Sequence, residues 1–221
     1  MLLPAEIGVM TLSNATLFPN ALLPLYIFEP RYRRMLKDAL NTHRLFCVSM
    51  QKLNCTRELP EAIAGVGLVR VAVEHDDGTS HVILQGLRRV ALGPARRYRP
   101  YRMQPIQSLD VPPCDSPAVD ALVGKVRELM AARLEMGLPI GLPMHPDGPA
   151  GTSPEAAREI LRYITDLTNP EQVADLVGCA LLQRGEERQT ILATLDVEAR
   201  LRHLVRFLIA DIQRERLTPK A

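Results

Sequence analysis

The densest group of side chains able to bind a ligand is a run of arginines between positions 88 and 102, with Tyr98 and Tyr101 among them. No acidic residue occurs from Gly78 to Leu109. Guanidinium groups interleaved with aromatic rings are typical of surfaces that bind phosphates and stack on bases, so RNA binding is one hypothesis for this segment. The structural alternative is that these arginines face water on a strand and pair with acids of the C-terminal half. The arginines are Arg88, Arg89, Arg96, Arg97, Arg99 and Arg102.

Two histidines flank a turn, with aspartates between them. His75 and His81 lie on either side of Asp76 and Asp77, and both imidazoles could reach one metal ion across two paired strands. The aspartates are already explained by the turn, because Asp is common there for its own hydrogen bonding. Cys47 and Cys55 are too isolated from other ligands for a zinc site. We therefore expect no metal and no cofactor.

Glu29 and Arg31 lie where an apolar strand meets the start of a helix. A carboxylate at that position can accept backbone N–H groups and complement the helix dipole. We expect Glu29 to be such a cap, or to pair with a strand arginine such as Arg89. No nucleophile or second polarising group accompanies it, which argues against a general base.

The first half of the chain must position these groups with strands. Short apolar, β-branched or aromatic runs bounded by turn residues predict strands. Asp77-Gly78 between two such runs predicts a hairpin. One helix is predicted from Pro30, because apolar residues then recur at helical spacing. The expected strands cover 22–28, 45–53, 66–73, 82–84, 90–92 and 98–106.

The second half predicts helices. Residues 111–116 are a proline-rich linker, and Ser116-Pro117, Ser153-Pro154 and Asn169-Pro170 are three helix start signals. Further helices are expected over 186–195 and from Val197 to about Gln213, the last with Arg200, Arg202 and Arg206 facing outward. The long Gly- and Pro-rich segment 137–152 is expected to be a functional or mobile loop. The expected domains are therefore 1–110 and 117–221, joined by 111–116.

Composition narrows the class of protein without naming a chemistry. The 221 residues are 47% hydrophobic and 24% charged with a net charge of +2, which is ordinary globular composition. No apolar run approaches the roughly 18 residues that span a bilayer, and the first residues are not a secretory signal. Four cysteines without a C-x-x-C pair suit reduced thiols. We expect a cytoplasmic protein with no membrane partner.

The segment Leu17–Tyr32, LFPNALLPLYIFEPRY, resembles the opening of the amino-terminal substrate-binding domain of Lon proteases. Further stretches resemble that family at the expected places, namely Gly65–Val71, Asp77-Gly78, Gly86–Val90, Asn169–Val177 and 189–201. The resemblance covers residues 10 to 213. It implies an α+β fold, with a PUA-like, partly open β barrel followed by a C-terminal helical bundle.

The resemblance also implies recognition rather than catalysis. The sequence has no G-x-x-x-x-G-K-[ST] phosphate loop, and Asp147–Gly151 echoes the surroundings of the Lon catalytic serine without the serine. We therefore expect a non-enzymatic module that binds unfolded or tagged polypeptide or a partner protein, with RNA as the alternative. The expected ligand site is the seam between the halves near the Phe28–Tyr32 corner, covered by the 137–152 loop. The candidate residues are Phe28, Glu29, Arg31, Tyr32, Arg88 and Arg89.

Overall fold

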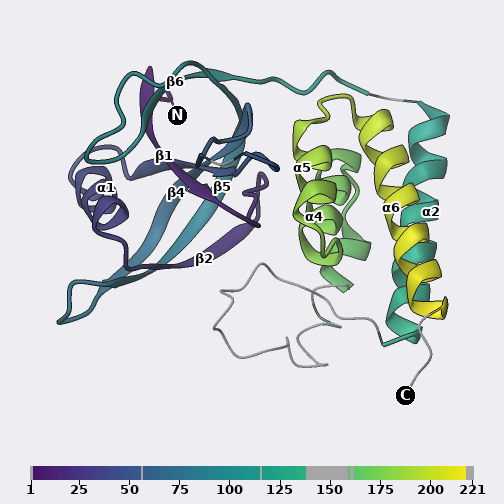
Figure 1. Ribbon diagram of the computed structural model, residues 1–221. Coiled ribbons are helices and arrows are strands. Elements are labelled where there is room, and N and C mark those ends of the chain that lie inside the picture. The colour runs from purple at the N-terminus through teal and green to yellow at the C-terminus, as the bar shows by residue number, and fades with distance from the viewer. Residues whose placement is uncertain (1, 56, 115, 138–158, 160–161, 218–221) are drawn as a thin grey trace. The chain divides into compact units, whose positions relative to one another are not determined.

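The computed structural model describes residues 2–55, 57–114, 116–137, 159 and 162–217 (Figure 1). The chain divides into two compact units, the first running to Asp110 and the second beginning at Val111. In the described residues, the first unit holds six strands and one helix, and the second holds helices. The expected α+β class is confirmed. The long segment 138–152 and the start signal at Ser153 lie outside the described residues.

The first unit is a six-stranded sheet that closes on itself over part of its length. The strand order is β2-β5-β4-β3-β1-β6, and a further pairing of β5 with β6 closes a five-stranded ring (Figure 1). β2 stays outside that ring and pairs with the first half of β5. The strands are β1 (Glu6–Leu12), β2 (Leu22–Ile27), β3 (Leu45–Met50), β4 (Ile63–Glu74), β5 (Ser80–Leu92) and β6 (Met103–Ser108).

The predicted Asp-Gly turn joins β4 to β5. Gly78 has φ +76°, a conformation that glycine adopts without steric cost. The Asp77 carboxylate accepts hydrogen bonds from the backbone N–H of Thr79 at 2.9 Å and from its hydroxyl at 2.7 Å. These bonds hold the pKa of Asp77 below its usual range. The turn sets the register that pairs Val73 with His81.

Two apolar clusters lie on opposite faces of the strands. The α1 helix (Pro30–Leu40) packs Met35, Leu36 and Ala39 into one cluster, together with Phe46 and Leu84. Side chains from the ring strands form the second cluster, which holds Ile7, Val9, Leu45, Cys47, Ala64, Val66 and Val90. Strands of the ring are therefore buried on both faces, which accounts for their nearly continuous apolar sequences.

The second unit consists of helices that begin where the sequence predicts. The side chain of Ser116 accepts from the N–H of Val119, and that of Asn169 accepts from the N–H groups of Glu171 and Gln172. A proline follows each cap. Among the described residues the full helices are α2 (Pro117–Glu135), α4 (Pro170–Leu181), α5 (Gly185–Ala193) and α6 (Val197–Leu217), and residues 162–166 are also helical. No helix among the described residues is long and apolar enough to cross a membrane.

One predicted orientation in α6 is wrong. Arg202 and Arg206 are exposed as expected, but Arg200 is completely buried. Its guanidinium donates to the Asp175 carboxylate at 2.9 Å and to the carbonyl oxygens of Thr194 and Leu195. A buried arginine needs such partners, and α4 and the turn before α6 supply them. Helical periodicity cannot reveal a carboxylate that comes from another helix.

Candidate functional site

Three paired strands carry an apolar face that the sequence analysis does not single out. β2, β5 and β4 lie side by side (Figure 1), and their register aligns Pro24 with Ile83 and Val71. The next row aligns Tyr26 with His81 and Val73. We name this surface the β2–β5–β4 face. It comprises Leu22, Pro24, Tyr26, Phe28, Val71, Val73, His81 and Ile83.

The large apolar side chains of this face are open to solvent. Leu22 and Phe28 are each 54% exposed, Val73 is 52%, Val71 is 45% and Ile83 is 38%. A single exposed apolar residue needs no explanation, but a contiguous set of this size is typical of a binding surface. The face is therefore the best candidate for a functional site in the first unit.

The other side of the same strands anchors them in the core. Leu23, Val82 and Leu84 are at most 2% exposed and belong to the cluster beneath α1. The irregularity in pairing between Val69 and Val71 brings Val71 and Val73 to the exposed side. A firmly packed inner side gives the face a fixed shape, and a fixed shape lowers the entropic cost of binding.

An aromatic row crosses the hairpin end of the face. The rings of Phe28 and Tyr26 stack with centroids 6.0 Å apart, and Tyr26 lies 5.0 Å from His81. His81 in turn meets the ring of His75 edge-on at 4.8 Å. The Tyr26 hydroxyl lies 3.1 Å from that of Thr79, which fixes the ring. Such a row offers flat apolar surface and polar edges to a ligand.

Phe28 is the predicted site residue that lies on this face, whereas Glu29 and Arg31 belong to an ion-pair group beside it. Arg31 bonds to Glu29 at 2.8 Å and to Glu58 at 2.6 Å. Glu29 does occupy the N-cap position of α1, but its side chain makes no capping hydrogen bond, so that expectation is wrong. The carboxylate pairs with Arg31 instead, two residues along the helix.

Tyr32 lies in the interior, 4% exposed. Its hydroxyl is 3.1 Å from the N–H and the carbonyl oxygen of Thr11 and 3.1 Å from Glu58. Burial raises the pKa of the phenol, so the hydroxyl stays protonated. Tyr32 thus ties α1 to β1 and to the segment around Glu58, and its contacts are structural.

The predicted arginine–tyrosine segment is divided between core and surface. Arg89 is 1% exposed, whereas Arg88 is exposed and donates to the Ser108 hydroxyl. Arg96 pairs with Glu6 at 2.8 Å. The guanidinium of Arg97 lies 5.3 Å from the Tyr101 ring, and Arg102 lies 5.0 Å from the Tyr98 ring. The partners named here all belong to the first unit. Because these arginines already contact a carboxylate, a hydroxyl and aromatic rings, the segment is less suited to bind phosphates than an open arginine cluster would be.

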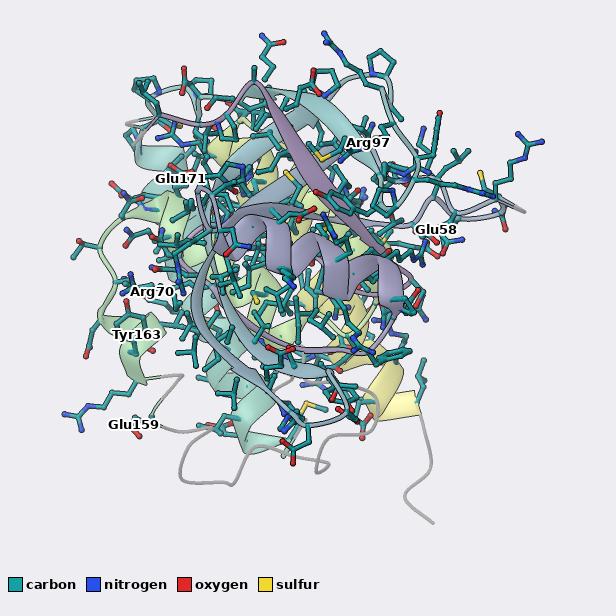
Figure 2. The ribbon with its side chains drawn as sticks, turned by 90° about the vertical axis from the view of Figure 1, so that its left-hand side faces the viewer. Glu58, Arg70, Arg97, Glu159, Tyr163 and Glu171 are labelled. Carbon is teal, nitrogen blue, oxygen red and sulfur yellow. The ribbon has the colours of Figure 1, made fainter. Side chains whose placement is uncertain are left out.

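The arginine segment lies beside the stretch of chain around Glu58. Arg97 and Glu58 lie toward one side of the first unit, and Arg70 of β4 lies toward the other (Figure 2). Arg102 donates to the carbonyl oxygen of Glu58 at 2.7 Å, and Arg31 pairs with the Glu58 carboxylate. The arginine segment and the Arg31 ion pairs therefore both contact Glu58. Phe28 follows the end of β2 that pairs with Ser80, whereas Arg88 and Arg89 lie near the other end of β5, so the candidate residues of the sequence analysis do not form a single site.

A pocket lies within the helical unit. It is an open pocket of about 310 Å³ where the linker segment meets the first turns of α4 and α6. The backbone N–H groups at the start of α4 are already bonded to the Asn169 side chain. The Glu171 carboxylate also lines the pocket and would repel an anion. The pocket is therefore poorly suited to an anionic ligand, and the β2–β5–β4 face remains the better candidate.

Comparison with known proteins places the chain in a family. Residues 6–210 match the family of the ATP-dependent protease La (LON) substrate-binding domain. Because the match covers most of the chain, the protein belongs to this family. The predicted resemblance is confirmed.

Similar sequences are found in complete Lon proteases. The chain is 22% identical over 214 residues to the Lon protease of Dictyoglomus thermophilum, an alignment covering 96% of this chain and 25% of that protein. It is 26% identical over 220 residues to Lon protease 1 of Thermus thermophilus, covering 97% of this chain and 26% of that protein. The chain spans about a quarter of the length of these curated relatives.

Solved structures share the fold. The N-terminal domain of the Mycobacterium avium complex Lon protease matches with a TM-score of 0.69 at 17% identity, covering 92% of this chain and 98% of that one. A Lon N-terminal domain protein from Xanthomonas campestris matches with a TM-score of 0.64 at 17% identity, covering 91% and 98%. The α+β fold of this chain is therefore that of Lon N-terminal domains.

Proposed function

We propose that this protein is a non-catalytic recognition module that binds apolar segments of unfolded polypeptide on the β2–β5–β4 face. The observation that carries the proposal is the set of five large apolar side chains, 38–54% exposed, of which four lie on three neighbouring strands and Phe28 directly follows β2. Membership of a substrate-binding domain family of a protease supports polypeptide as the ligand.

The dimensions of the face suit an extended chain. Neighbouring strands lie about 4.8 Å apart, and side chains on one side of a strand repeat about every 6.8 Å. Positions of the face along one strand, such as Leu22, Pro24 and Tyr26 of β2, therefore present groups at the spacing of alternate side chains in an extended ligand that lies along the strands. Binding of this kind buries side chains and transfers no proton or group. It needs no nucleophile, metal or cofactor, in keeping with an interaction module rather than an enzyme.

The test uses charged substitutions at exposed positions. A fluorescent, permanently unfolded peptide with several apolar residues is titrated with the full chain, its Ile83→Asp variant and its Val71→Asp variant. Both side chains point to solvent, so the variants should fold, which circular dichroism checks. We expect each to bind at least about tenfold more weakly, because a carboxylate must be desolvated beneath the peptide.

The matched control is Leu134→Asp, which changes an apolar residue of 43% exposure in the helical unit. This variant should bind the peptide like the parent chain. Equal affinity of Ile83→Asp, Val71→Asp and the parent would exclude the β2–β5–β4 face as the binding surface.

The same titration separates polypeptide from RNA. Apolar docking should change little between about 50 and 200 mM salt, whereas contacts to several phosphates weaken steeply over that range. If single-stranded RNA binds, if its affinity falls steeply with salt and if it is lost in Arg88→Ala, the RNA alternative holds instead.

A further inference from the structure

We propose that His75 and His81 form a two-imidazole site for a divalent transition-metal ion of the Ni²⁺, Cu²⁺ or Zn²⁺ class at the tip of the β4–β5 hairpin. The carrying observation is that Nε2 of His75 lies 2.7 Å from Nδ1 of His81. The site shares His81 with the edge of the β2–β5–β4 face, but metal binding is measured without peptide, so neither proposal depends on the other.

The hairpin brings the two rings together by its register. His81 pairs with Val73 across the strands, and the N–H of His75 bonds to the carbonyl oxygen of Thr79. Both histidines are exposed, and the hairpin extends beyond the other elements of the first unit (Figure 1). A hydrated ion can therefore reach both rings without any opening of the fold.

The geometry needs only a small adjustment to hold a metal. A nitrogen–metal bond is about 2.0–2.1 Å, which in a tetrahedral site places two nitrogens roughly 3.3 Å apart. The present 2.7 Å separation fits one shared hydrogen, so the rings would part by roughly 0.6 Å to take an ion in its place. A neutral imidazole has one N–H hydrogen, which can lie on either ring nitrogen. Metal binding would need that hydrogen on the nitrogen facing away from the ion, which is a change of tautomer only.

Neighbouring side chains restrain the orientation of the His81 ring and leave the other coordination positions of a bound ion open to water. Stacking on Tyr26 at 5.0 Å restrains the His81 ring. The Asp77 carboxylate is occupied by Thr79, whereas Asp76 is exposed beside His75. Among the described residues no group of three or more histidine, cysteine, aspartate or glutamate side chains could hold a metal. Water completes the shell, and imidazole ligands select the Ni²⁺, Cu²⁺ and Zn²⁺ class over Mg²⁺ or Ca²⁺.

The test measures metal binding directly, with the full chain freed of any affinity tag and of bound metal. Calorimetric titration with Ni²⁺ should show one ion per chain. His75→Ala and His81→Ala should each weaken that binding by at least roughly tenfold, since even the loss of an outer-shell partner costs that much. The control is His203→Ala, a histidine of α6 stacked on Phe207, which should bind like the parent.

A second measurement identifies the ligands. Substoichiometric Cu²⁺, which is paramagnetic, should broaden the imidazole resonances of the residues that bind it. In the NMR spectrum the signals of His75 and His81 should broaden before those of His43 and His203. Mg²⁺ should have no effect. Unchanged Ni²⁺ affinity in both hairpin variants, or earlier broadening at His43 or His203, would overturn the proposal.

Discussion

Arg200 and Arg202 stand two residues apart on α6 and experience opposite environments. Arg200 is completely buried against Asp175, whereas Arg202 pairs in solvent with Glu198 of the preceding turn. A buried charge that loses its partner is expensive, and an exposed pair contributes little because water screens it. The two arginines therefore form a natural matched pair for a stability measurement.

We expect Arg200→Met to lower the free energy of unfolding by about 3–5 kcal/mol, since Asp175 stays buried without this guanidinium. Arg202→Met should change it by less than about 1 kcal/mol. Urea unfolding monitored by circular dichroism measures both. Similar small losses in the two variants would mean that the Arg200–Asp175 pair is not buried as described.

Tyr32 offers a second test at the residue scale. Tyr32→Phe keeps the ring but removes the hydroxyl that meets the buried N–H of Thr11. Leaving that donor without its partner should cost about 1–3 kcal/mol of unfolding free energy. Tyr163→Phe, at a tyrosine that is 61% exposed, should cost almost nothing. A loss at Tyr163 as large as that at Tyr32 would contradict the assigned role.

The cysteines differ in burial, and their reactivity should follow it. Burial raises the pKa of the Cys179 thiol to about 12 and raises that of Cys47 as well. Since the thiolate is the reactive form, both should be inert at pH 8 in the folded chain. Cys55 and Cys114 are partly exposed.

A disulfide reagent at pH 8 should therefore label Cys55 and Cys114 in the native protein and all four cysteines after unfolding. The sign of the pH dependence follows from the same shift. The unfolded thiol ionises above about 8.5, so Cys179 favours the folded state below that pH and loses this contribution as the pH rises toward 12. Rapid native labelling of Cys179 would show that α4 opens readily.

At the scale of elements, two glycines should respond oppositely to the same substitution. A Cβ at Gly86 of β5 would collide with the backbone carbonyl oxygen of Phe18, whereas a Cβ at Gly124 of α2 would meet nothing within 4 Å. We expect Gly86→Ala to destabilise the fold by about 3 kcal/mol or more, because a backbone atom must move. Gly124→Ala should stabilise it by up to about 1 kcal/mol, as alanine favours helix.

Thermal unfolding of the two alanine variants checks this contrast. A Gly86→Ala protein as stable as the parent would mean that the segment around Phe18 does not pack tightly over β5. A destabilised Gly124→Ala protein would mean that α2 has a neighbour at that position.

The sequence predicts helix starts and turns well where a residue's own backbone preference determines the local structure. Pro30 and Ser116-Pro117 begin helices, and Asp77-Gly78 turns a hairpin, because each depends on its own backbone conformation. The β2–β5–β4 face is missed for the opposite reason. Its strands are apolar at consecutive positions, as in Leu22–Phe28, and such a pattern is typical of strands buried on both sides. Only the pairing of strands shows that one side stays open.

Contacts between residues far apart in the sequence likewise cannot be predicted from residue spacing along the chain. Glu29 is predicted as a cap from its place before Pro30, yet Arg31 and Glu58 determine what it contacts. Tyr32 and Arg89 are candidate binding residues by their proximity to Phe28 and Arg88, but both lie in the interior. Burial depends on tertiary packing, which a single sequence does not specify residue by residue.

At the scale of the whole molecule, the two units have different parts in the proposed function. The first unit carries the β2–β5–β4 face on strands whose other side is packed beneath α1. The second unit holds its helices with buried arginine contacts such as Arg200–Asp175, and the pocket beside the start of α4 is poorly suited to an anion because Glu171 lines it. We therefore expect the first unit to make the contacts with polypeptide.

Amide chemical-shift mapping on the isotope-labelled full chain tests that claim most directly. An unfolded apolar peptide is added stepwise while the backbone resonances are followed. We predict that the largest shifts cluster at Leu22, Val71, Val73 and Ile83, with little change in α2 or α6. Shifts confined to the helices or to the arginine segment 94–102, with the β2–β5–β4 face silent, would contradict it.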